Sequence, residues 1–422
     1  MPSPADSSTP TPKIRRRRSP GRALETVLLA STACLMAAVA WPIAAGGFSG
    51  PQAEWDAPVA ASTPELPAQA MATEQPVIQI ALLLDTSSSM DGLIDQARTQ
   101  MWSVVNALDS ASYKGSRSRL QIAVYEYGND TLEGSQGWIR QVQPFTDELD
   151  VVSQALFSLT TNGGTEHAGE AIARSLDELS WAEGEGVLKV AYIAGNEGFD
   201  QGPISASAAK ERASGKSVVV NTIFCGNPDE GDAAGWRTAA GTFGGRFASI
   251  DHNHVVQHIA APQDAEIARL GQELNDTYIR YGAHGRAGLD NMVAQDNNMA
   301  GYGEGSVVQR SLAKSKRMYR NDSWDLVDAL EADKVAIGSV ERSDLPTELQ
   351  GLDDEELAAE VSKQSERRAE LQTQISELAA EREAYVAAER QRLGEDPAAL
   401  DQAILGGIRD QATAAGFTLE SA

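Results

Sequence analysis

Residues 77–85 read VIQIALLLD and are followed by TSSSM at residues 86–90. The first run is apolar almost throughout, which is typical of a strand buried on both faces of a sheet. From residue 90 onward the apolar side chains recur every three or four positions, a spacing that predicts a helix with one buried face. They are Met90, Leu93, Ile94, Ala97, Met101, Val104, Val105 and Leu108. The folded part of the chain therefore opens with a strand, a short polar loop and a helix.

The same alternation of short apolar runs and helical stretches continues along the chain. The runs are LQIAVYEYG (120–128), VLKVAYIAG (187–195), SVVVNTIFCG (217–226) and RFASID (246–251). Strands that alternate with helices form a mostly parallel sheet with both faces covered. We predict an α/β fold with a doubly wound, mostly parallel sheet over residues 76–260, followed by an all-helical C-terminal region.

No strand is predicted after residue 262. Residues 261–345 read as a helical extension, and residues 346–422 as a long charged helix centred on residues 353–393. The apolar seam of this helix is interrupted by Gln364, Arg368 and Arg382 at heptad positions; its members are Leu357, Val361, Leu371, Ile375, Leu378 and Tyr385. Two interpretations stay open, an imperfect coiled coil and a helix packed on the rest of the chain or on its neighbours.

The N-terminal 45 residues have the layout of an export signal. The basic cluster KIRRRR (13–18) precedes residues 27–45, VLLASTACLMAAVAWPIAA, which carry no charge. A positive segment before an apolar one predicts export, and this apolar run is also long enough to span a bilayer. We therefore expect either a cleaved signal peptide or a membrane anchor, with the folded part in the periplasm or outside the cytoplasmic membrane. Residues 46–75, rich in Pro, Ala, Ser and Thr, read as a flexible linker.

Charge and cysteine content narrow the choice of partner. The formal net charge is −25, the first 45 residues carry +4, and the remainder therefore carries −29. Such a surface repels phosphate backbones, so no nucleic-acid partner is expected. The two cysteines are Cys34, inside the apolar run, and Cys225, at the end of a predicted strand, so no intrachain disulfide framework is expected.

The loop after the first strand carries a pattern suited to a metal ion. Asp85, Ser87 and Ser89 are spaced two apart at the carboxyl end of that strand, where doubly wound sheets place their ligand sites. One carboxylate and two hydroxyls can converge on a hard cation such as Mg²⁺, Mn²⁺ or Ca²⁺. The same letters also suit a turn and a helix N-cap.

A second loop strengthens the metal interpretation. Asn162-Gly163-Gly164-Thr165-Glu166 precedes a predicted helix, and its two glycines allow the backbone to direct the Thr165 hydroxyl toward the sheet edge. An ordinary turn that ends in a threonine N-cap would explain this loop alone. Both loops in this order, on this alternation of strands and helices, favour one shared site.

The two motifs together resemble the metal-ion-dependent adhesion site of von Willebrand factor A domains. The resemblance covers residues 76–260 and implies Asp85, Ser87, Ser89 and Thr165 as metal ligands, with a carboxylate of a protein partner completing the shell. The third element of that family, usually Thr-Asp-Gly, is replaced here by Ile193-Ala194-Gly195-Asn196-Glu197. Gly195 or Asn196 stands at the aspartate's position, depending on register. Outer-shell roles are expected for Asn196, Glu197 and Asp200.

These observations lead to three functional hypotheses. The first is a metal-dependent, adhesion-type protein-binding module of the cell envelope that is not an enzyme. The second is a scaffold that acts through its C-terminal helices and keeps a vestigial metal site. The third is a phosphate-transferring enzyme that uses Asp85, although Ser87 stands where such enzymes carry a second aspartate. The serine-hydrolase, P-loop and zinc-protease motifs are absent from the sequence.

Overall fold

The computed structural model of the chain describes residues 75–251, 258–393 and 400–419. The expected export signal or anchor, residues 1–45, lies outside these ranges, as does the expected linker except for Gln75. Within them, no helix combines the length and the apolar character that a membrane crossing requires.

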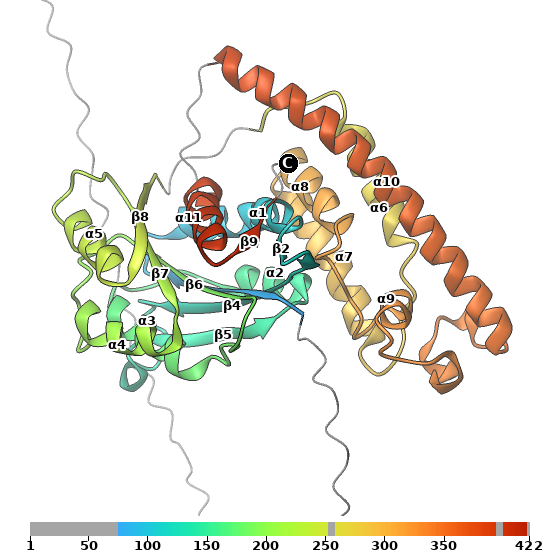
Figure 1. The fold of residues 1–422 in the computed structure, drawn as a ribbon, viewed down its shortest axis with the longest axis horizontal. Coiled ribbons are helices and arrows are strands. Elements are labelled where there is room, and N and C mark those ends of the chain that lie inside the picture. The colour runs from blue at the N-terminus through green and yellow to red at the C-terminus, as the bar shows by residue number, and fades with distance from the viewer. Residues whose placement is uncertain (1–74, 252–257, 394–399, 420–422) are drawn as a thin grey trace, which may run out of the picture. The chain divides into compact units, whose positions relative to one another are not determined.

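A six-stranded sheet forms the core of the α/β part (Figure 1). Its order is β5-β4-β1-β6-β7-β8, and every neighbouring pair is parallel except β4 with β5. The strands are β1 (Val77–Asp85), β4 (Arg119–Tyr127), β5 (Ile139–Thr146), β6 (Val187–Gly195), β7 (Val219–Cys225) and β8 (Gly244–Ile250). The prediction of a doubly wound, mostly parallel sheet is confirmed. The chain builds the sheet outward on both sides of β1, so the end of β1 lies at the switch point where such sheets bind ligands.

Four strands were not among those expected from the sequence. β5 is the antiparallel edge strand, and because most of its side chains are half-buried, no continuous apolar run marks it. The other three form a separate small sheet and are β2 (Ser112–Tyr113), β3 (Ser116–Arg117) and β9 (Phe417–Thr418). β9 corrects the expectation that no strand follows residue 262. A strand of two residues is too short to give a recognisable apolar run in the sequence.

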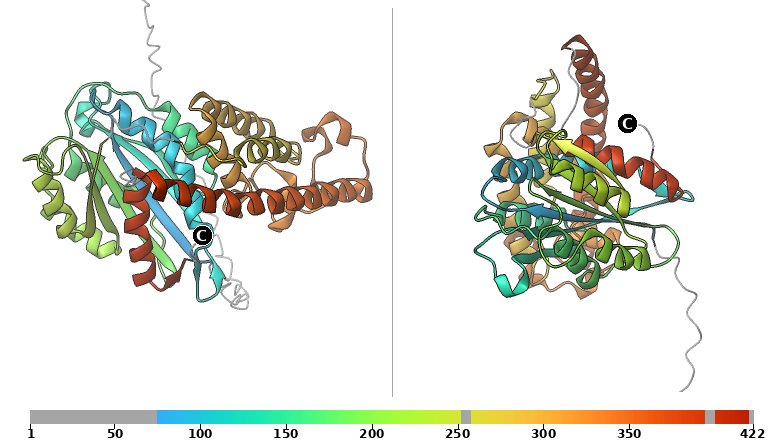
Figure 2. Two further views of the ribbon diagram at one scale, coloured as in Figure 1. Left: turned by 90° about the horizontal axis from the view of Figure 1, so that it is seen from above. Right: turned by 90° about the vertical axis from the view of Figure 1, so that its left-hand side faces the viewer.

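Helices cover both faces of the sheet (Figures 1 and 2). Those that connect its strands are α1 (Asp91–Leu108), α2 (Leu149–Ser158), α3 (Ala168–Glu178), α4 (Ala206–Lys216) and α5 (Ala233–Thr242). Side chains of β1 alternate between two apolar clusters, with Ile80 packed on the α1 and α2 side and Ala81 on the α3 to α5 side. Both faces of the central strand are therefore buried, as its unbroken apolar run requires.

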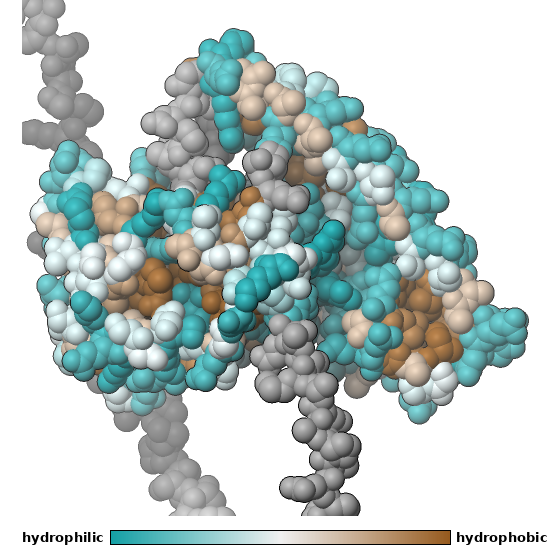
Figure 3. Space-filling view, viewed as in Figure 1, coloured by the Kyte–Doolittle hydropathy of each residue, from teal (hydrophilic) through white to brown (hydrophobic). Residues whose placement is uncertain are grey.

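The region after the sheet is helical, as predicted. Its helices are α6 (Asp264–Asn275), α7 (Gly285–Gly301), α8 (Glu304–Lys314), α9 (Leu326–Glu331), α10 (Asp354–Leu393) and α11 (Leu400–Ala414). The short 3₁₀ turns of the chain are η1 (Gly134–Gln136), η2 (Ile337–Ser339), η3 (Arg342–Asp344) and η4 (Thr347–Leu349). An apolar cluster around α9, the α9 cluster, has as its buried members Ile279, Leu326, Val327, Val340, Leu345, Leu357 and Val361. Figure 3 shows apolar surface over this part of the chain. Several side chains packed against the cluster are only half-buried, and they are Leu330, Val335, Ile337, Leu349 and Leu352.

The long charged helix α10 buries its apolar seam within the chain. Leu357 and Val361 pack in the α9 cluster, while Leu371 and Ile375 pack against α6 and α8. Toward its end the contact shifts by one residue, because Tyr385 is 41% exposed and Val386 is buried. The packed-helix interpretation describes this part of the chain, and the seam that a coiled coil would need is occupied.

The two arginines that interrupt the seam are buried and paired. Nη1 of Arg368 lies 2.8 Å from Oδ2 of Asp325 and 2.7 Å from Oδ1 of Asp328. Nε of Arg382 donates to Oδ1 of Asp264 over 2.7 Å. Buried charges require such partners, so the breaks in the heptad pattern mark where α10 meets α6 and the start of α9.

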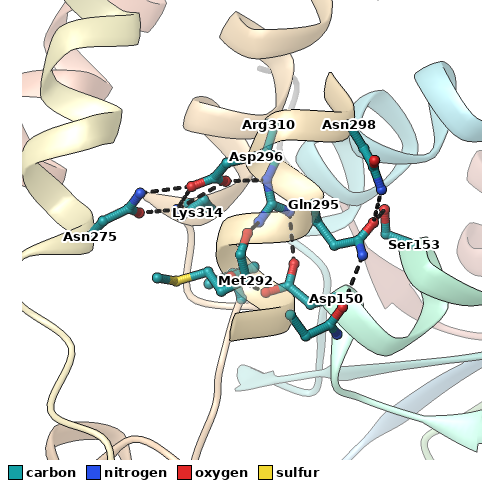
Figure 4. A network of polar contacts seen from close by, with 11 residues as sticks. Asp150, Ser153, Asn275, Met292, Gln295, Asp296, Asn298, Arg310 and Lys314 are labelled. Atoms are coloured by element: carbon teal, nitrogen blue, oxygen red, sulfur yellow. Dashed lines mark hydrogen bonds and ion pairs between the residues drawn. The ribbon is translucent and has the colours of Figure 1, made fainter. Parts of the chain in front are cut away.

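A buried ionic network joins the helical region to the α/β part (Figure 4). Arg310 of α8 is 2% exposed, and its Nη1 lies 2.7 Å from Oδ1 of Asp150 on α2. It also pairs with Asp296 of α7, which holds the buried Lys314 at 3.1 Å. Ser153 of α2 donates to Gln295 of α7 over 2.9 Å. The extension is therefore fastened to α2 by polar contacts that water does not reach.

The last helix, α11, returns to the sheet. Ile404, Ile408 and Ala412 are buried in the same apolar cluster as α1 and α2. The hydroxyl of Tyr192 on β6 donates to the carbonyl oxygen of Ile404 over 2.8 Å. The covering of this sheet face therefore depends on residues far beyond the 76–260 range that the sequence assigned to the α/β domain.

Candidate metal centre

Asp85 lies at the bottom of the candidate site. It is the last residue of β1, pairs in register with Tyr127 of β4, and is completely buried. The backbone N–H of Ser87 donates to Oδ1 of Asp85 over 2.7 Å. Its other oxygen, Oδ2, accepts no hydrogen bond from an N–H or hydroxyl of the described residues, although the carboxyl of Glu166 interacts with Asp85. A buried carboxylate oxygen without a donor is costly unless something else satisfies it.

Two hydroxyls and an amide lie above this carboxylate. The Oγ atoms of Ser87 and Ser89 are 3.4 Å apart. Asn196, directly after β6, donates from Nδ2 to Oγ of Ser89 over 3.1 Å. Oδ1 of Asn196 is buried and also has no donor among the described residues. The structure therefore brings Asp85, Ser87, Ser89 and Asn196 together at the end of β1.

Gly195 decides the register of the third loop. A Cβ atom built on Gly195 would overlap the hydroxyl of Tyr127 and would lie 3.1 Å from Oδ2 of Asp85. No side chain fits at this position, so Asn196 is the residue of this loop whose side chain faces the site.

The loop that carries Thr165 is tied to the first loop by its backbone. The N–H of Ser88 donates to the carbonyl of Gly163 over 3.0 Å, and the N–H of Asn162 donates to the carbonyl of Thr86 over 2.9 Å. Thr165 is half-buried and forms an isolated β-bridge with Gly128, the residue after the end of β4. These contacts place Thr165 beside the Asp85 loop.

Glu166 is a site residue that the sequence interpretation missed. Its side chain is 4% exposed and lies against Asp85, because a Cβ on Gly128 would lie 2.8 Å from Cγ of Glu166 and 2.9 Å from Oδ1 of Asp85. Burial and the neighbouring charge of Asp85 raise the pKa of Glu166 to about 9. Burial likewise raises the pKa of Asp85 to about 6. Two carboxyls in one buried space resist ionising together.

The two remaining predicted residues differ in their relation to the site. Glu197 is exposed, but its charge raises the pKa of both Asp85 and Glu166, so it lies within electrostatic reach. Asp200 is exposed, and within residues 75–251 no hydrogen bond joins its carboxylate to Asp85. The signal for Glu166 was present in the sequence as an acidic residue next to Thr165.

The chemistry of this group of residues fits a hard divalent cation. It offers carboxylate, hydroxyl and amide oxygens, and two of these oxygens are buried and accept no hydrogen bond from an N–H or hydroxyl of the described residues. Across the described ranges, no group of three His, Cys, Asp or Glu side chains gathers in a geometry for a metal. A cation here would therefore depend on the serine hydroxyls and the asparagine amide as well as on Asp85, which favours Mg²⁺, Mn²⁺ or Ca²⁺ over softer metals.

Comparison with known proteins gave one family match and several similar structures. The model of the von Willebrand factor type A domain matches residues 79–234. A comparison with curated proteins found no match. Proximal thread matrix protein 1 from the mussel byssus, with a zinc-occupied MIDAS motif, is 14% identical at a TM-score of 0.32, over 42% of this chain and 42% of that chain. The chain thus spans less than half the length of that mussel protein.

Two further structures cover a larger share of their own chains. An aerotolerance-related membrane protein from Bacteroides fragilis is 18% identical at a TM-score of 0.30, over 41% of this chain and 92% of that chain. The SpRpn10 VWA domain is 13% identical at a TM-score of 0.30, over 41% and 87%. Taken with the sheet order and the loops around Asp85, the family match shows that residues 79–234 form a von Willebrand factor type A domain, followed in this chain by a helical C-terminal region.

Proposed function

We propose that this chain is a protein-binding module whose affinity depends on a divalent cation. The observation that carries the proposal is Oδ2 of Asp85, a buried carboxylate oxygen that accepts no hydrogen bond from an N–H or hydroxyl of the described residues. It lies next to a second buried carboxyl, that of Glu166, and the loop after it carries the hydroxyls of Ser87 and Ser89. Asp85, Ser87, Ser89 and Thr165 would hold the ion. When bound, the ion supplies a Lewis-acidic position that an anionic oxygen can fill.

The roles of the surrounding residues follow from their contacts. The N–H of Ser87 fixes Oδ1 of Asp85, which leaves Oδ2 to face the ion. Asn196 orients the hydroxyl of Ser89, and Glu197 would hold an outer water molecule. A carboxylate of a protein partner would take the open position. Such a site binds and releases a partner without forming or breaking covalent bonds.

The two rival hypotheses have less support. A phosphate-transferring role for Asp85 is disfavoured because the loops around it carry acidic side chains and no Lys or Arg, and such surroundings repel phosphate. A scaffold that acts through a coiled coil is disfavoured because the seam of α10 is buried against α6, α8 and α9.

We also propose that the module works in the cell envelope. The basic cluster and the uncharged residues 27–45 support export or anchoring. In either case the adhesion-type site would face the periplasm or the outside of the cytoplasmic membrane, where a protein partner is met.

Titration calorimetry of the full chain with Mg²⁺, Mn²⁺ and Ca²⁺ tests the metal site. The unaltered chain should bind one cation saturably, and Asp85→Asn should abolish this heat while its circular dichroism stays unchanged. Asp147→Asn, an exposed change just after β5 at the opposite end of the sheet, should bind as the unaltered chain does. Equal binding by Asp85→Asn, or no binding by the unaltered chain, would contradict the proposal.

A further inference from the structure

The loops around the candidate metal centre carry charge of only one sign. They are the segments that follow β1, β4, α2, β6 and β7, at residues 86–90, 128–138, 159–167, 196–205 and 226–232. None of these segments contains Lys or Arg. Their exposed carboxylates are Asp130, Glu133, Glu197, Asp200, Asp229, Glu230 and Asp232, which we call the acidic rim.

The acidic rim surrounds the buried carboxylate from more than one side. Asp130 packs against Gly163 of the Thr165 loop. Asp232 lies beside Gly198, in the loop that also carries Glu197. Within the same loops the side chain of Asp85 is fully buried, and its Oδ2 accepts no hydrogen bond from an N–H or hydroxyl of the described residues, so this end of the sheet favours a cationic group.

The opposite end of the sheet is different. Its loops carry exposed acids such as Asp147, Glu183 and Glu185, but also Lys114 and Arg117. Lys114 pairs with Glu185. The one-signed charge is therefore a property of the end that holds the candidate site, beyond the general acidity of the chain.

Arginines on the elements that border the acidic rim are already engaged. Arg140 of β5 pairs with the buried Glu126. Arg237 of α5 lies over the ring of Phe247 and donates to the carbonyl of Pro228. Among the described residues, neither arginine forms an ion pair with a carboxylate of the acidic rim, so the rim carboxylates face water.

A bound cation does not remove this charge. A divalent ion can balance Asp85 and Glu166, the two buried carboxyls, but the seven exposed carboxylates of the acidic rim remain. An acidic partner surface would be repelled on approach, whereas a basic one would be steered toward the site. A partner carboxylate therefore approaches the ion more readily when basic side chains around it offset the charge of the rim.

We propose that the partner of this site is a protein with a basic surface, in which lysines and arginines frame the single carboxylate that reaches the metal. This inference rests on the proposed function for the carboxylate and adds the chemical class of the surface around it. The basic side chains would pair with the acidic rim, and their contribution would fall with salt because the rim is exposed.

Three synthetic peptides probe this surface on the full chain. The first carries one Glu between Lys-Ser-Lys arms, the second the same Glu between Asp-Ser-Asp arms, and the third has Gln in place of Glu between the basic arms. Fluorescence anisotropy in Mg²⁺ should show binding of the first peptide, weaker binding of the third and none of the second. Raising NaCl from about 50 mM to about 500 mM should weaken the first by at least roughly tenfold.

Two matched triple variants locate the effect. Asp130→Asn/Asp229→Asn/Asp232→Asn removes rim charge and should weaken the first peptide by roughly tenfold or more at low salt. Asp147→Asn/Glu183→Gln/Glu185→Gln removes the same number of charges at the opposite end and should not. Equal effects of the two triples, equal affinity for the acidic peptide, or no binding of the basic peptide would overturn the proposal.

Asp85→Asn separates this inference from the proposed function. If binding of the first peptide is weakened by the rim triple variant but is unchanged by Asp85→Asn and by EDTA, the proposed metal-dependent site is rejected and the proposal of a basic partner stands. If binding requires Asp85 and Mg²⁺ but is unchanged in the rim triple variant, the proposed metal site stands and the proposal of a basic partner is rejected.

Discussion

Arg310 is the residue whose loss should most weaken the attachment of the helical region. Its guanidinium is 2% exposed, pairs with Asp150, which is 4% exposed, and lies 4.7 Å from the ring centre of Trp102. In Arg310→Met, Asp150 would lose its ion pair, and among the described residues it would keep the hydrogen bond from the hydroxyl of Tyr319. Removing one member of a buried ion pair costs about 3–5 kcal/mol, because the other charge stays buried.

Denaturant unfolding of the full chain, followed by circular dichroism, measures this cost. Arg367→Met on α10 is the matched control, since Arg367 is 45% exposed and pairs with Glu273 on the surface, where ion pairs contribute little. The double variant Arg310→Met/Asp150→Asn should cost less than the sum of its single changes, because it removes the stranded charge. A loss in Arg310→Met no larger than in Arg367→Met would refute the reasoning.

Three further outcomes are expected. Because burial raises the pKa of Glu166 to about 9 from its ordinary 4.5, the metal-free fold holds a proton that the unfolded chain releases, and its stability should fall as pH rises between these values. Glu166→Gln should lose this slope, which melting temperatures in EDTA at several pH values would reveal; unchanged slopes would contradict the assignment. Gly195→Ala should lower both Mg²⁺ affinity and stability, by about 1–3 kcal/mol, whereas Gly215→Ala, with nothing within 4 Å of its Cβ, should do neither. Leu371→Ala, fully buried on α10, should cost about 2–5 kcal/mol, and Tyr385→Ala, 41% exposed, should cost far less in the chain alone; the reverse order would favour a coiled coil.

The parallel sheet could be predicted because its strands are buried on both faces and read as unbroken apolar runs. β5 escaped because an edge strand of half-buried side chains carries no such run. Helix α11 escaped as a separate element because Gly406 and Gly407 interrupt its pattern. The second of these glycines lies where a Cβ would come within 3.1 Å of the Tyr192 hydroxyl, so the break in the helical pattern serves its packing on the sheet.

Sequence spacing could predict only the part of the candidate site that lies within one short loop. Asp85, Ser87 and Ser89 share one short loop, so their meeting follows from local geometry. The position of Glu166 beside Asp85 depends on backbone hydrogen bonds that join its loop to the loop after β1. The spacing of residues in the sequence does not predict these hydrogen bonds. Similarly, Arg368 looked like a defect in a coiled-coil seam, and only its pairing with Asp325 explains why a charge is kept there.

The position of α11 bears on how the chain reaches this fold during synthesis. The face of the sheet that contains Ile80 and Val190 shares its apolar cluster with Ile408, a residue made after α10 has been completed. Until then the nascent chain presents apolar strand surface that its own sequence cannot yet cover, and such surface attracts chaperones or aggregates. A stop codon shortly after α10 should therefore yield a protein that is degraded or insoluble, with the sheet itself as the damaged part although every strand of it is present.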